Sequence, residues 1–425
     1  MGHTRIGTFY GWRVVQAAFV LALFGWGLGF YGPPVFLSVI RETHGWSMTL
    51  IASAISLHFL VGSLVGGKLP ALHERFGASA VIKAGALSMA AGICGWAMAD
   101  SPWHLFVAAV LSGAGWGTMS ASALNSIVAP WFVRGRPAAL GMAYNGGSVG
   151  GIVFSPLWVM AIGGLGFPLT ASCIAVLTVL VLWVLANAVF SKTPETKRAR
   201  PDGDAPDAPV VSPTSPAARP LPGAMLWRDR TFLMLAAGMA LGLFAQIGLI
   251  AHLFSLLVPA LGAQQAGLAM ALVTVMAIAG RTLLGWTMPL GADRWLVGCA
   301  GYLLQAAGSL ILMAAGGANV PLLLAGVVLF GLGFGNATSL PPLIAQVEFV
   351  EGDVPRVTAL IVAIAQAGYA IAPGVFGWVR EVTSPASMET GEAPAVVAAA
   401  ALVQCLAVAA FLSGRPRRSA SCRNA

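Results

Sequence analysis

Arg281 stands inside an otherwise apolar stretch, AIAGRTLLGWTMPLGADR, at residues 277–294. A central arginine costs about 2.5–3.5 kcal/mol on membrane-insertion scales, so an arginine kept at that depth usually serves a function. Its guanidinium remains protonated and presents a planar fork of donors that fits a carboxylate. The alternative is an arginine whose stem reaches the interface or that pairs with a neighbouring helix. We expect Arg281 to bind the carboxylate of a ligand.

Acidic residues are missing from the middle of every long apolar stretch. Asp100, Glu348, Glu351 and Asp353 all lie near the ends of such stretches or in loops. Proton-coupled pumps of cationic drugs usually need a buried carboxylate. The pattern therefore favours an anionic ligand as the counter-ion of Arg281 and disfavours drug efflux.

His252 and His58 are the only central groups of the apolar stretches that titrate near neutral pH. His252 is therefore a candidate proton carrier. An equal alternative is a neutral His252 ring that bonds to a helix carbonyl. For His58, a satisfied packing histidine is the more common situation.

Six polar side chains in the apolar stretches offer neutral hydrogen bonds to a ligand, and each of them is equally able to join two helices. They are Tyr31, Asn125, Tyr144, Asn145, Asn336 and Tyr369. Tyr31 belongs to GWGLGFYGPP, residues 25–34, where glycine and proline loosen the helix. A membrane tolerates such loosening only where the freed backbone groups face protein or a cavity.

The elements that must position these residues are membrane helices. The chain has 425 residues, of which 58% are hydrophobic and 9% charged, and a water-soluble globule does not have this composition. Apolar windows of about 20 residues, each enough to cross a bilayer, recur in two sets of six. They are residues 13–39, 48–70, 79–99, 103–130, 137–163 and 167–190, then 231–257, 265–289, 295–316, 320–345, 356–379 and 393–413. We predict an all-α polytopic membrane protein with 12 transmembrane helices.

Basic residues set the expected orientation, because Lys and Arg concentrate on the cytoplasmic side. With both termini in the cytoplasm, Arg41 and Arg380 fall outside and Arg281 falls within the membrane, which leaves 20 of the 23 basic residues on the cytoplasmic side. We expect a multi-pass protein of the inner (plasma) membrane. The net charge of +8 indicates contact with anionic lipid, and no basic domain exists outside the membrane to bind nucleic acid.

The cysteines do not suggest a metal or redox site. Four of the five occur singly in different apolar windows, and none has a metal-ligand spacing. We expect packing thiols, no cofactor and no metal.

Residues 191–229 break the apolar pattern with Pro, Ala, Asp, Lys and Arg, a composition that cannot bury a core. We expect a disordered cytoplasmic linker there. It separates an N-terminal six-helix bundle at residues 1–190 from a C-terminal bundle and tail at residues 230–425.

An internal repeat relates the two halves. An offset of about 219 residues aligns several markers in the same order: Glu74-Arg75 with Asp293-Arg294, Gly113 with Gly331, Arg136 with Arg356, Leu140 with Leu360, and Pro156 with Pro373. Such a series indicates two pseudo-symmetric six-helix bundles with a substrate site at their interface near the membrane midplane.

Across its whole length the chain resembles a major facilitator superfamily transporter. The resemblance rests on PALHERFG at residues 70–77, PLGADRW at residues 289–295 and the arginine-bearing turn near residue 136. It implies a gating-loop motif, which maps onto Glu74, Arg75, Gly77, Arg136, Asp293 and Arg294. This loop departs from the family pattern, because Pro70, Glu74, Ala78 and Ser79 replace a Gly, an Asp and two basic residues.

Within the superfamily, three features resemble the monocarboxylate transporter and oxalate/formate antiporter group. They are FYGW at residues 9–12, WFVRGRPAALGMAYNGG at residues 131–147, and Arg281. The resemblance implies that Arg281 binds the substrate carboxylate and that His252 assists. Many eukaryotic members carry an Asp four residues before that arginine, where this chain has Ala277.

The sequence thus predicts a secondary transporter, not an enzyme, that moves a small organic anion by alternating access of two rocking halves. We expect a monomer in the lipid bilayer, with a proton as the candidate coupling ion. Two alternatives remain open. One is a major facilitator transporter of another solute, such as a drug or sugar exporter. The other is a transporter-like sensor that binds its ligand without moving it.

Overall fold

The computed structural model describes residues 9–133, 135–197, 199–203, 223–288, 292–338, 340–350, 353–383 and 391–416. The regular structure in these ranges is helical. Eleven helical spans are long and apolar enough to cross a membrane, and Val320–Phe334 is a shorter apolar helix. The expected all-α fold with twelve membrane helices is confirmed.

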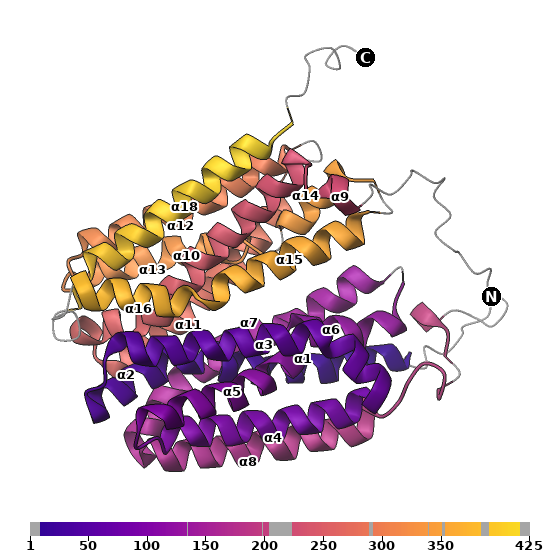
Figure 1. The fold of residues 1–425 in the computed structure, drawn as a ribbon, viewed down its shortest axis with the longest axis horizontal. Coiled ribbons are helices and arrows are strands. Elements are labelled where there is room, and N and C mark those ends of the chain that lie inside the picture. The colour runs from indigo at the N-terminus through magenta and orange to yellow at the C-terminus, as the bar shows by residue number, and fades with distance from the viewer. Residues whose placement is uncertain are drawn as a thin grey trace.

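The helices form two bundles, one in the lower half of Figure 1 and one in the upper half. The N-terminal bundle contains α1 (Tyr10–Gly29), α2 (Gly32–His44), α3 (Met48–Phe76), α4 (Ala78–Ala97), α5 (Pro102–Met119), α6 (Ala121–Val128), η1 (Ala129–Trp131), α7 (Arg136–Leu165), α8 (Phe167–Leu185) and η2 (Ala186–Phe190). The C-terminal bundle contains α10 (Arg230–Leu261), α11 (Ala263–Thr287), α12 (Arg294–Ala314), α13 (Val320–Phe334), α14 (Leu340–Glu348), α15 (Val354–Ala370), α16 (Ala372–Thr383) and α18 (Pro394–Gly414). Short helices η3 (Pro201–Gly203) and α9 (Gly223–Leu226) flank residues 204–222. Those residues, about half of the expected linker at residues 191–229, lie outside the described ranges.

The bundles meet along a seam. Its main contacts are α7 with α11, α3 with α15 and α16, and α2 with α10. One end of the molecule, which we call the terminal end, carries the start of α1, the end of α18, η3 and α9, and the opposite end is the far end (Figure 1). Towards the terminal end the bundles diverge, with α6 in one and α14 and α15 in the other (Figure 1).

The first membrane span breaks between α1 and α2, where the sequence predicts a loosened helix. The backbone N–H groups of Phe30 and Tyr31 both bond to the carbonyl of Trp26. The carbonyl of Gly27 accepts from Trp158 Nε1 at 3.2 Å. The backbone groups freed by the break therefore face protein, as a membrane requires.

The carbonyl of Gly29, at the end of α1, is satisfied by His58 of α3. His58 Nε2 lies 3.0 Å from that oxygen, and His58 Nδ1 lies 2.8 Å from Ser112 Oγ. Ser112 Oγ also accepts from Trp96 Nε1 at 3.0 Å. Because both ring nitrogens have partners, a neutral His58 joins α1, α3 and α5, which is the packing role expected for it.

Alternate glycines bring equivalent helix pairs together in the two bundles. A Cβ built on Gly113 would lie 2.4 Å from the carbonyl oxygen of His58, and one on Gly117 would lie 2.8 Å from that of Gly62. In the other bundle, a Cβ on Gly331 would lie 2.8 Å from the carbonyl oxygen of Val273, and one on Gly335 would lie 2.1 Å from that of Ala277. Only glycine allows helices to approach so closely. The glycines repeat at an offset of 218 and the carbonyls at 215, so the sequence repeat corresponds to a repeated packing of α5 on α3 and α13 on α11.

Candidate functional site

Arg281 lies on α11 at the seam and is partly buried. Its Nε donates to the carbonyl oxygen of Gly335, 3.2 Å away, in the turn that follows α13. No carboxylate of the described residues forms an ion pair with Arg281. The guanidinium is therefore anchored through Nε, while Nη1 and Nη2 have no hydrogen bond to the described part of the chain.

The end of α13 is held by three long side chains from three helices. Gln305 Nε2 of α12 donates to Gly333 O at 3.1 Å, and Gln246 Nε2 of α10 donates to Phe334 O at 2.9 Å. Arg281 completes the set at Gly335 O. These carbonyls form the negative end of a helix dipole, which attracts a cation. Arg281 thus makes the contact with a neighbouring helix that is expected of a structural arginine. Its Nη1 and Nη2 donors remain in addition to that contact.

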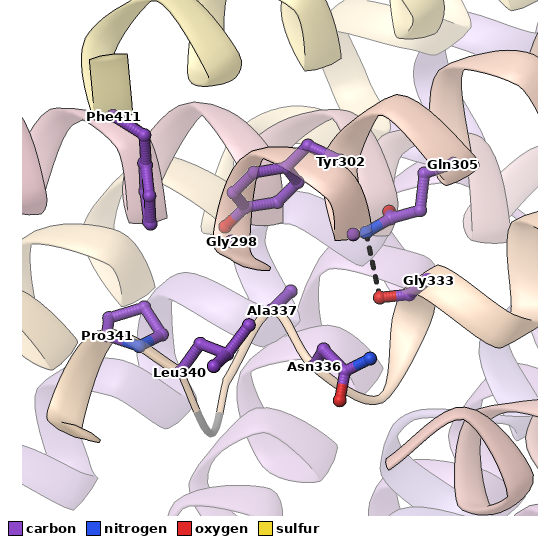
Figure 2. Close-up of a pocket in the computed structure, with 10 residues that line it drawn as sticks. Gly298, Tyr302, Gln305, Gly333, Asn336, Ala337, Leu340, Pro341 and Phe411 are labelled. Atoms are coloured by element: carbon purple, nitrogen blue, oxygen red, sulfur yellow. Dashed lines mark hydrogen bonds between the residues drawn. The ribbon is translucent and has the colours of Figure 1, made fainter. Parts of the chain in front are cut away.

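A small cavity lies beside this break, and Figure 2 shows the bond from Gln305 to Gly333 at its edge. Its volume is about 10 Å³, which is the space of one water and too small for an organic anion. Tyr302 Oη and Gln305 Oε1 line it and have no protein partner among the described residues.

Tyr31, in the break between α1 and α2, joins Arg281 at the seam. A Cβ built on Gly151 of α7 would lie 2.5 Å from Tyr31 Cζ and 2.7 Å from Thr274 Oγ1. The three residues therefore converge from three segments. Tyr31 also lies close enough to Arg281 for an electrostatic interaction. Thr274 is two helical turns from Arg281 on α11, and the sequence analysis did not identify it.

Helices α7 and α11 run antiparallel, so the contacts between them show which residue of α7 lies at the same height as Arg281. Gly267 contacts Pro156, and Gly151 contacts Thr274. Two turns further along both helices, Tyr144 lies at the level of Arg281. The Tyr144 hydroxyl accepts from Asn125 Nδ2 at 2.7 Å. The structure therefore brings Tyr144 and Asn125 together as a polar pair across the seam from Arg281.

The other predicted polar residues are distributed around this level. Asn145, next to Tyr144, is exposed. Asn336 is buried in the turn beside Gly335. The partly buried ring of Tyr369 on α15 packs against Phe59 of α3, with ring centroids 5.8 Å apart. Phe59 belongs to the N-terminal bundle, so this contact crosses the seam.

His252 does not lie at the level of Arg281. Helices α10 and α11 run antiparallel from Gly262, and His252 is ten residues from that turn whereas Arg281 is nineteen. The difference is roughly 14 Å along the axis at 1.5 Å per residue. The His252 side chain is fully buried, and its Nε2 lies 3.1 Å from Pro373 O. A ring bonded to a helix carbonyl was the alternative interpretation, and it is the arrangement that the structure has.

Arg380 is a second buried arginine that the sequence analysis missed. The sequence analysis placed it on the outer side of the membrane, and its side chain on α16 is only 1% exposed. Its Nη1 donates to Ser255 Oγ at 2.5 Å, and Ser255 Oγ donates to His252 O at 2.8 Å. The apolar window was ended at residue 379, whereas the helical span continues to Thr383. Extending that window would have found it.

The gating-loop residues occupy helix ends at the terminal end of the bundles. Glu74 and Arg75 are exposed in the last turn of α3, Gly77 ends that helix with φ 77°, and the Arg75 guanidinium lies over the Phe76 ring. Arg136 donates to the carbonyls of Phe132 and Ala129.

In the second bundle, Asp293 is the N-cap of α12 and pairs with Arg415 Nε at 2.6 Å, and Arg294 donates to Leu343 O. Arg136, Asp293 and Arg294 therefore bond within their own bundles in this conformation.

Comparisons with known proteins agree with this architecture. The sequence model described as Major Facilitator Superfamily matches residues 17–373. Two solved structures, titled nucleoside transporter NupG and a bacterial homolog to human lysosomal transporter Spinster in an inward-facing and occupied conformation, have TM-scores of 0.71 and 0.69. They cover 95% and 96% of this chain and 99% and 98% of their own, at 13% and 17% identity, so they share the fold.

Curated relatives match a short segment. Multidrug resistance protein MdtH of Yersinia enterocolitica is 44% identical over 75 residues, and MdtH of Yersinia pestis is 43% identical over 75 residues. Each match spans 18% of this chain and 18% of the relative.

Proposed function

The chain belongs to the Major Facilitator Superfamily of transporters, and on that premise we propose that it moves a small organic anion, a monocarboxylate, by alternating access. The observation that carries the proposal is Arg281, which lies at the seam without a described acidic partner. A charge at this depth needs compensation. The ligand supplies it.

The anchoring of Arg281 determines how a carboxylate would bind. Because Nε donates to Gly335 O, the guanidinium plane is fixed and its outer edge, Nη1 with Nη2, remains for the ligand. Two parallel N–H···O bonds along that edge match the two oxygens of a carboxylate. Tyr144 and Asn125, at the same level across the seam, add neutral hydrogen bonds to the anion or to its substituents.

Alternating access requires that the seam can open and close. At the far half of the seam, α16 contacts α3 through Gly374 and Gly377, and Glu381 accepts from Thr49 N at 2.9 Å. These contacts join the two bundles without covalent connection. Releasing them while closing the terminal end would expose Arg281 to the other side of the membrane.

Drug efflux is the second candidate, because the curated relatives are named multidrug resistance proteins. It requires a binding site for organic cations or neutral drugs. Within the described residues, the acids lie at helix ends and loops, and the charged side chain of α11 at the seam, Arg281, is positive. The local chemistry therefore favours an anion.

The test is counterflow in proteoliposomes with labelled mono- and dicarboxylates and a cationic drug. Arg281→Gln should lower the apparent affinity for the carboxylate at least a hundredfold, because truncating one partner of a charged pair costs several kcal/mol. Arg281→Lys should also bind weakly, since it lacks the planar fork. Arg228→Gln, an exposed arginine before α10, is the matched control. A folded Arg281→Ala with near-normal carboxylate affinity would show that Arg281 is only a packing residue.

A further inference from the structure

We propose that the anion bound at Arg281 carries a flat aromatic body, so that the substrates are aromatic carboxylates. This inference rests on the proposed function and narrows its substrate class. It comes from a continuous set of rings, here called the aromatic wall, that extends from Tyr31 across the seam. Its members are Trp26, Phe30, Tyr31, Phe59, Trp116 and Tyr369.

The rings of the aromatic wall contact one another in sequence. Tyr31, which interacts electrostatically with Arg281, packs on Phe30 with centroids 4.9 Å apart, and Phe30 lies 6.1 Å from Phe59. From Phe59 the wall divides. One branch reaches Tyr369 at 5.8 Å, and the other reaches Trp116 at 6.4 Å and then Trp26 at 4.9 Å. The wall therefore begins at Tyr31, within electrostatic reach of Arg281, and draws rings from both bundles.

Glycines on the facing helices fix these rings in place. A Cβ on Gly62 would lie 2.3 Å from the Trp116 ring, and a Cβ on Gly147 would lie 2.8 Å from the Trp26 ring. Gly151 makes the corresponding close approach to Tyr31 at 2.5 Å. Each ring fills the space that a side chain would need if it replaced the facing glycine. The wall is therefore rigid, and the backbones of the facing helices determine its shape.

Two members of the wall are not fully covered. Phe30, Tyr31, Phe59 and Trp116 are 3–7% exposed. Trp26 and Tyr369, one from each bundle, are only partly buried. The neighbouring pairs within the wall are mostly edge-to-face, at 75–84° between ring planes. A further ring, from a ligand, can join Trp26 and Tyr369 in the same geometry that aromatic pairs prefer.

The chemistry of the wall separates substrate classes. A sugar or nucleoside needs several polar side chains for its hydroxyls, whereas the wall offers mainly carbon surface, with the Tyr31 and Tyr369 hydroxyls and the indole N–H groups of Trp26 and Trp116 as its polar groups. A short aliphatic acid would bind Arg281 but gain little from the rings. An aromatic carboxylate uses both Arg281 and the aromatic wall, with its carboxylate on Nη1 and Nη2 and its ring against Trp26 and Tyr369.

The first experiment uses the unmodified protein in proteoliposomes and measures competition against labelled benzoate and labelled lactate. We expect phenylacetate and benzoate to compete at concentrations at least tenfold lower than acetate or lactate. Benzamide has the ring without the charge and should compete weakly. Equal competition by aliphatic and aromatic acids would overturn the inference while leaving carboxylate transport in place. Binding of no carboxylate at all would overturn the proposed function itself.

The second experiment compares Trp26→Ala and Tyr369→Ala with Phe24→Ala. Phe24 is a buried ring of α1 that packs on Phe154, outside the wall. The two wall variants should lose about tenfold in benzoate affinity, a typical upper value for one aromatic contact, with less than a twofold change for lactate. Tyr369→Phe should retain benzoate affinity. Equal losses for benzoate and lactate in the wall variants would mean that these rings only pack the seam.

Discussion

Arg281 Nε donates to the carbonyl oxygen of Gly335 across 3.2 Å, which ties the charge of α11 to the point where α13 ends. The same contact explains how an arginine is kept in an apolar stretch and why only its outer edge is available. It also links ligand binding to the break between α13 and α14, because any movement of that turn moves the guanidinium.

Gln246 should be required for the stability of this break. Gln246→Leu leaves the buried carbonyl of Phe334 without its donor, which costs about 1–3 kcal/mol. Thermal unfolding in detergent should show a lower midpoint, whereas Gln264→Leu at the exposed start of α11 should not. An unchanged midpoint in Gln246→Leu would mean that the carbonyl finds another donor.

His252→Gln should transport with the same pH dependence as the unmodified protein. The glutamine amide can replace the bond from Nε2 to Pro373 O, and the position is roughly 14 Å along the axis from Arg281. The measurement is uptake against external pH, with His44→Gln, an exposed histidine, as the control. Loss of the pH response in His252→Gln alone would identify His252 as the proton carrier after all.

Gly377→Val should block closure of the far half of the seam. A Cβ at Gly377 would lie 2.6 Å from Ala52 Cβ of α3, in the opposite bundle. We expect transport to slow at least tenfold and a cysteine at Ser53 to label faster from outside. Gly163→Val is the matched control, because a Cβ there meets nothing within 4 Å. Normal transport by a folded Gly377→Val would show that α16 and α3 need not pack this closely.

The orientation in the membrane can be tested with one threonine from each end. Thr196 follows η2 near the terminal end, and Thr43 lies in the last turn of α2 at the far end, and both are exposed. On a cysteine-free background, Thr43→Cys should react with an impermeant thiol reagent added to intact cells. Thr196→Cys should react only after permeabilisation. The reverse pattern would place both termini outside.

The sequence by itself determined the elements of this protein. Eleven of the twelve apolar windows are helical spans and the twelfth contains the shorter apolar helix Val320–Phe334, because a bilayer leaves the backbone no other way to satisfy its hydrogen bonds. GWGLGFYGPP ended α1 where proline and glycine weaken a helix. The alternate glycines near Gly113 and Gly331 revealed the repeated close packing of α5 and α13, since small residues are what such contacts require.

Only the tertiary structure decided which polar groups meet. Arg281 is 54 residues from Gly335, and His252 is 121 residues from Pro373, so no local pattern pairs them. The sequence analysis counted Arg380 only as a basic residue on the outer side of the membrane, whereas α16 places it against Ser255. The aromatic wall likewise joins α1, α3, α5 and α15. Hydropathy follows from each residue alone, but a partner depends on how helices far apart in the chain rotate against one another.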